Sequence, residues 1–89
     1  MADNAIVRPE DVLPDGVDGT LLNGVPVRKG SVAAFVANAQ RLQRLTPGTD
    51  EHRQVSDQLR ALTPAVAAVG LFEIFEARSP ELRDIIAAT

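Results

Sequence analysis

Three Thr-Pro or Ser-Pro pairs divide the second part of the chain, and they constrain its fold more than any other feature. The pairs are Thr46-Pro47, Thr63-Pro64 and Ser79-Pro80. Proline lacks the N–H group that an interior helical turn needs, but it suits the first position of a helix. A Ser or Thr just before it can cap the exposed N–H groups of the first turn. The pairs therefore predict boundaries between consecutive helices.

The segments between these pairs carry apolar residues at intervals of three or four positions, which is typical of helices with one buried face. The expected helices lie at 32–46, 50–62, 64–78 and 80–88. Ser31, Thr49 and Ser79 are the expected N-caps, because each directly precedes one of these segments or its opening proline.

Asn23-Gly24 stands between two apolar segments and predicts a β-hairpin over residues 20–28. Both residues of such a two-residue turn need positive φ, which Asn and Gly adopt readily. In this register Leu21 faces Pro26, and the second strand must be an edge strand because proline donates no hydrogen bond. The residues expected to share the face that covers the helices are Leu22, Val25 and Val27.

The length of 89 residues, with 45% hydrophobic residues, predicts one folded domain spanning 1–89. Within it we expect a turn-rich N-terminal segment at 1–19, the hairpin at 20–28 and a helical part at 31–89. The expected fold class is α+β, mainly α, with an N-terminal β-hairpin followed by a compact array of four helices.

The composition argues against several functional classes. There is no cysteine and one histidine, His52, so thiolate and multi-histidine metal centres are not expected. The absence of Trp and Tyr, with three Phe, argues against stacking on single-stranded nucleic acid. A nucleophile, a base and a cofactor motif do not occur together, so we expect a protein that is not an enzyme and that uses no cofactor.

The N-terminal sequence Met1-Ala2-Asp3-Asn4 has an acid and no basic region, so we expect no secretion signal. The longest run without a polar side chain, Pro64 to Phe72, has nine residues, against the roughly 20 that a membrane span needs. These features predict a cytoplasmic protein of bacterial type without membrane contact.

Two sets of basic residues are candidate binding sites. Arg28 and Lys29 precede Ser31 at an expected helix start, where free N–H groups could hold a small anion such as phosphate or carboxylate. The basic face expected on the first two helices consists of Arg41, Arg44, Arg53 and Arg60. This face is the basis of the alternative hypothesis, a nucleic-acid-binding regulator, which the pI of about 4.9 opposes.

The expected helix 64–78 is apolar on nearly all sides over its first two turns, which is typical of a helix in a core or an interface. A small chain without disulfides or metals is often stabilised by association with a second copy. We therefore expect a non-catalytic interaction or regulatory module that forms a homodimer or binds another protein. The residues expected to mediate self-association are Val66, Val69, Phe72 and Phe75.

Overall fold

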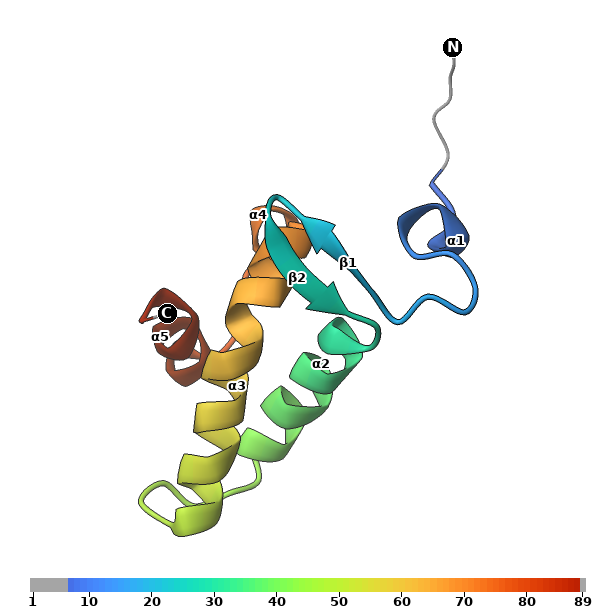
Figure 1. Ribbon diagram of the computed structural model, residues 1–89. Helices are drawn as coiled ribbons and strands as arrows, with labels where there is room; N and C mark the ends of the chain where they lie inside the picture. The colour runs from blue at the N-terminus through green and yellow to red at the C-terminus, as the bar shows by residue number, and fades with distance from the viewer. Residues whose placement is uncertain (1–6, 89) are drawn as a thin grey trace.

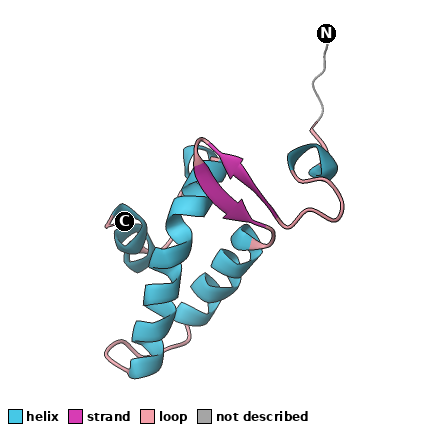
Figure 2. Ribbon diagram, in the orientation of Figure 1, coloured by secondary structure: helices cyan, strands magenta, loops and turns pink. Residues whose placement is uncertain are grey.

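The computed structural model describes residues 7–88 (Figure 1). The expectation drawn from Met1 to Asn4, that no secretion signal opens the chain, lies outside the described residues. The elements in chain order are α1 (Pro9–Val12), β1 (Gly19–Leu22), β2 (Val25–Arg28), α2 (Ser31–Leu42), α3 (Asp50–Val69), α4 (Leu71–Ile74) and α5 (Pro80–Ala87). Figure 2 shows a mainly helical molecule with one two-stranded antiparallel sheet, which confirms the predicted fold class.

The hairpin forms with the predicted turn and register. Asn23 and Gly24 have φ angles of 50° and 78°, and Leu21 pairs with Pro26. Val27 is buried against the helices, whereas the alternating residues face outward. At the turn, Asn23 Nδ2 donates to the carbonyl oxygen of Ala68 at 3.4 Å, which attaches the hairpin to the C-terminal end of α3.

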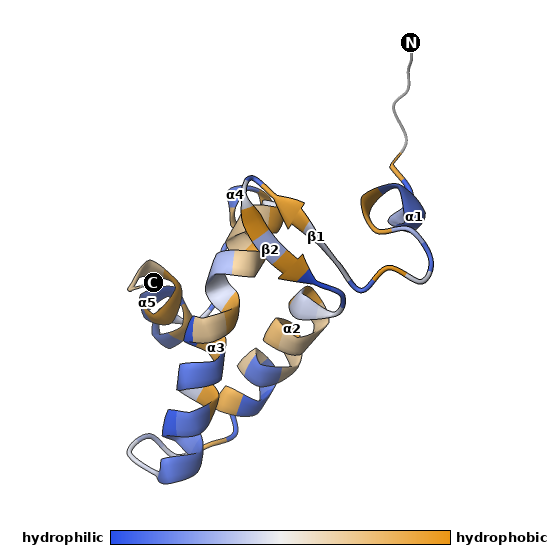
Figure 3. Cartoon of the chain, in the orientation of Figure 1, coloured by the Kyte–Doolittle hydropathy of each residue, from blue (hydrophilic) through white to orange (hydrophobic). Residues whose placement is uncertain are grey.

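The core lies where α2 and α5 pack against α3. Its buried members are Phe35, Leu42, Val55, Leu59, Val66 and Ile85. Figure 3 shows that the first turns of α3 are hydrophilic and that apolar residues gather toward the hairpin end of the molecule. In the described part of the chain, no helix is both long and apolar enough to cross a membrane.

The predicted boundary at Thr63-Pro64 is wrong, because α3 continues through both residues. Pro64 cannot donate to the carbonyl of Arg60, but both residues are exposed, so water can reach that carbonyl. Thr63 is buried, and its hydroxyl donates to the carbonyl oxygen of Leu59 at 2.7 Å. Packing of α3 on both sides of the proline therefore outweighs the local preference for a new helix.

The predicted helix over 64–78 is also wrong. Gly70 ends α3 in the left-handed conformation, with a φ of 96°, and the short helix α4 begins directly after it. Phe75 is already extended, with φ −123° and ψ 147°. The apolar residues from Ala65 to Phe72 are thus divided between two helices rather than placed around one.

Two of the three predicted caps are confirmed. Thr49 Oγ1 accepts from the N–H of His52, and Ser79 Oγ accepts from the N–H of Leu82. At α2 the N-cap is Gly30, with a φ of 85°, so Ser31 is the first helical residue instead of the cap. This helix ends at Leu42, four residues earlier than predicted. Its last carbonyl groups accept hydrogen bonds from residues three positions later: the N–H of Arg44 donates to the carbonyl of Arg41, and the N–H of Leu45 donates to that of Leu42.

Candidate functional site

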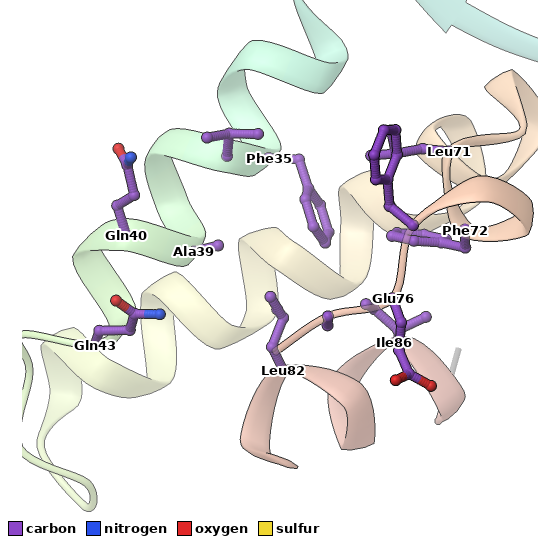
Figure 4. A pocket seen from close by; sticks show the side chains of 12 residues that line it. Phe35, Ala39, Gln40, Gln43, Leu71, Phe72, Glu76, Leu82 and Ile86 are labelled. Carbon is purple, nitrogen blue, oxygen red and sulfur yellow. The ribbon is translucent and has the colours of Figure 1, made fainter. Parts of the chain in front are cut away.

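An apolar groove is the candidate functional site, and α2, α4 and α5 form its walls. It consists of two adjoining hollows, with cavity volumes of about 190 and 330 Å³. Figure 4 shows Phe35 of α2 and Phe72 of α4 directed into the space that Leu82 and Ile86 of α5 close from the other side. We call this feature the groove; the lining residues shared by both hollows are Phe72, Phe75, Glu76, Ala77 and Ile86.

The C-terminal wall of the groove depends on how the chain turns between α3 and α5. The positive φ of Gly70 redirects the backbone, so that Leu71 and Phe72 pack back onto the core. After α4, Arg83 Nη1 donates to the carbonyl oxygens of Ala77 and Arg78 at 2.9 and 3.2 Å. These two bonds fix the connecting segment beside the first turns of α5.

The inner wall of the groove is an aromatic pair between α2 and α4. The rings of Phe35 and Phe72 meet edge to face, with centroids 5.7 Å apart. Such a pair contributes about 0.5–1.5 kcal/mol beyond the burial of its area. Phe35 is fully packed in the core, whereas Phe72 is half-buried and keeps one side toward the groove.

The rim of the groove exposes large apolar side chains. Phe75, which lines both hollows, is 65% exposed. On the opposite wall Val36 is also exposed. Neighbouring apolar groups that remain in water are typical of a contact surface for another protein.

The four residues predicted for self-association do not form one surface. Phe72 and Phe75 line the groove, and Val69 is partly exposed on α3. Val66 is fully buried in the core and has no surface to offer a partner. Sequence analysis missed the contributions of α2 and α5, namely Val36, Ala39, Leu82 and Ile86, because their apolar spacing is that of core residues in general.

The predicted basic face is largely neutralised by neighbouring carboxylates. Arg41 pairs with Glu51, Arg53 with Asp50 at 3.0 Å, and Arg60 with Asp57 at 3.0 Å. Arg44 makes no ion pair within the described residues. Since phosphate binding requires cations whose charge is not already compensated, this arrangement does not favour a nucleic-acid interface.

The helix start predicted to bind an anion uses its hydroxyl internally. Ser31 is buried, and its Oγ donates to the carbonyl oxygen of Arg28 at 2.7 Å. Arg28 and Lys29 are exposed beside it. Anion binding at these residues stays a prediction. The Ser31 hydroxyl was expected to take part in it, but it is directed at the carbonyl oxygen of Arg28 instead.

His52 has a carboxylate partner that is distant in the sequence. Its Nε2 lies 2.8 Å from Glu81 Oε2, which connects α3 to the first turn of α5. Ser56, one turn along α3, is buried, but its hydroxyl makes no hydrogen bond to His52 in the described part of the chain. The contact between His52 and Glu81 therefore joins α3 to α5.

Residues 7–88 contain no group of three or more His, Asp or Glu side chains that could hold a metal ion. Comparison of the chain with protein-family models, with curated proteins and with solved structures finds no match.

Proposed function

We propose that this protein is a non-catalytic interaction module that forms a homodimer through the groove. The observation that carries the proposal is the groove itself, with Phe75 exposed at its rim. The polar side chains that line its first hollow, Gln40, Gln43 and Glu76, do not converge on one point of its floor (Figure 4). Small-molecule sites combine an apolar floor with a few convergent polar groups, so this groove fits apolar side chains of a protein better than a small ligand.

The exposed rim provides a driving force for association. Full burial of one Phe or Ile side chain stabilises by about 1.5–3 kcal/mol relative to water. A contact between two identical surfaces across a two-fold axis uses each side chain twice. Phe75 in two copies would therefore supply part of the free energy of a moderately stable dimer.

The test compares two substitutions at similarly exposed apolar positions. Phe75→Asp places a charge at the rim of the groove, whereas Leu21→Asp places one on the outer face of the hairpin, where Leu21 is 67% exposed. We expect Phe75→Asp to convert the dimer to a monomer in light scattering after gel filtration, and Leu21→Asp to remain dimeric. Circular dichroism checks that both variants are folded. Equal behaviour of the two variants would contradict the proposal.

A further inference from the structure

Two further hollows adjoin each other along one face of α3, and the larger lies between α3 and α5, which pack side by side (Figure 1). Their cavity volumes are about 290 and 380 Å³. Both are lined by His52, Ser56 and Arg60, which are four positions apart and so share one face of the helix. The α5 residues that line the larger hollow are Glu81, Asp84, Ile85 and Ala88. We call the two hollows together the α3–α5 cleft.

Ser56 places a hydroxyl without a hydrogen-bond partner at this cleft. The residue is 5% exposed, and its Oγ makes no hydrogen bond to any other described residue. The two other buried hydroxyls, those of Ser31 and Thr63, each donate to a carbonyl oxygen at 2.7 Å. A buried hydroxyl without a partner is destabilising and uncommon in native structures. A polar group bound in the cleft would supply the missing hydrogen bond.

The cleft is negatively charged once the neighbouring ion pairs are counted. Its two arginines, Arg53 and Arg60, are each paired with an aspartate three positions earlier, at 3.0 Å. His52 is in contact with Glu81, whereas Asp84 has no ion-pair partner within residues 7–88. The cleft therefore has an excess of one negative charge when His52 is protonated and of two when it is neutral. This excess opposes an anion and favours a cation.

The larger hollow offers hydrogen-bond acceptors beside apolar surface. Asp84 contributes a carboxylate without a partner, and Ser56 Oγ has lone pairs to accept with. Ile85 and Ala88 contribute apolar side chains to the same hollow. A primary ammonium group has three N–H donors and no acceptor, so it matches these oxygens both in hydrogen bonding and in charge.

We propose that the α3–α5 cleft binds a primary ammonium group on a short alkyl chain. The ammonium group donates to Ser56 Oγ and to the carboxylate of Asp84, and the alkyl chain lies against Ile85 and Ala88. Such groups occur in free alkylamines and in lysine side chains of other proteins, and the experiment distinguishes these two sources. The site is independent of the homodimer, because the cleft and the groove have no lining residue in common.

The experiment follows the backbone amide resonances of the isotope-labelled full chain while n-butylammonium chloride replaces sodium chloride at constant pH. We expect saturable shifts at Ser56, Asp84 and Ala88, with half-saturation at about 1–10 mM, since a small ligand makes few contacts. Potassium chloride lacks the alkyl chain and sodium butyrate lacks the ammonium group, so neither should give saturable shifts there. Saturable shifts with potassium or butyrate, or none with butylammonium, would overturn the proposal.

Three variants test whether the named side chains form the site. Ser56→Ala and Asp84→Asn should each weaken butylammonium binding at least about tenfold, because each removes a hydrogen bond to a charged group. Asp15→Asn removes the same charge from an exposed position before β1 and should bind like the unmodified chain. The melting temperature of Ser56→Ala should not fall, since the lost hydroxyl has no partner. Unchanged affinity in Ser56→Ala, or equal affinity in Asp84→Asn and Asp15→Asn, contradicts the site.

A second titration identifies the source of the ammonium group. Nα-acetyl-lysine methylamide carries the same group on a lysine side chain with a peptide bond on each side. Tighter binding of this compound than of butylammonium assigns the cleft to a lysine side chain of a partner protein. Equal or weaker binding assigns it to a free alkylamine.

Discussion

At the scale of single residues, two glycines in the left-handed conformation set the ends of neighbouring elements. Gly24 closes the hairpin and Gly70 separates α3 from α4. The space around Gly24 is open, since a Cβ there would have no atom within 4 Å. Its requirement is therefore one of backbone conformation and not of room.

Replacing Gly24 by Val should lower the free energy of unfolding by about 1–2 kcal/mol, because a β-branched residue adopts positive φ only at a cost. Gly24→Asn is the matched control and should lose less, since Asn tolerates this conformation. Urea denaturation followed by circular dichroism measures both values. Equal losses for Val and Asn would show that the turn does not require positive φ at this position.

The sequence predicts the turn at Gly24 correctly, whereas the helix predicted over 64–78 runs through Gly70, which ends α3 in the structure. Asn23-Gly24 is a local signal, because the turn type depends on two adjacent residues. Gly70 lies in an apolar run, where the sequence alone does not distinguish a glycine that allows close contact between helices from a glycine that ends a helix. The structure shows that a Cβ on Gly70 would meet only Glu73 Oε2, at 3.6 Å, so its positive φ is the reason for glycine there.

At the scale of elements, α3 shows why local signals do not fix helix boundaries. Thr63-Pro64 has the same composition as a true helix start, and Ser79-Pro80 is one. The difference is that Thr63 and Val66 are buried on both sides of Pro64, so one continuous helix packs better than two. Such packing involves residues of other elements, which periodicity in the sequence does not identify.

Replacing Pro64 by Ala should stabilise the protein by about 1–2 kcal/mol. The replacement restores the hydrogen bond to the carbonyl of Arg60, and this gain outweighs the loss that comes from a more flexible unfolded chain. Pro80→Ala is the control at a true first helical position and should be neutral or destabilising. Thermal and chemical denaturation compare the two. Loss of stability in Pro64→Ala would indicate a helix start at Pro64 and contradict the continuous α3.

The contact between His52 and Glu81 should contribute to holding α5 against α3. The side chains are 15% and 45% exposed, so solvent screens the pair only in part. A double-mutant cycle with His52→Ala and Glu81→Ala should give a coupling free energy of about 0.5–1 kcal/mol.

The matched cycle for this test uses Asp57 and Arg60, an exposed pair three residues apart on α3. It should give about 0.2–0.5 kcal/mol. In hydrogen exchange, His52→Ala should lower protection in α5 more than in α2. A coupling no larger than that of the control pair would show that the contact does not hold α5.

At the scale of the whole molecule, the groove could be predicted only in part. Phe72 and Phe75 stand out in the sequence because they extend an apolar run. Val36 and Ile86 do not, since each belongs to an ordinary amphipathic stripe and becomes part of a groove only when α2 and α5 face each other. Val66, selected by the same argument as the two phenylalanines, is core.

Sedimentation equilibrium of the unmodified chain tests the homodimer most directly. The chain has a mass of 9.5 kDa, and we predict a monomer–dimer equilibrium with a limiting mass of twice this value as the concentration rises through the micromolar range. A single species of 9.5 kDa throughout that range, including high micromolar concentration, would contradict the account.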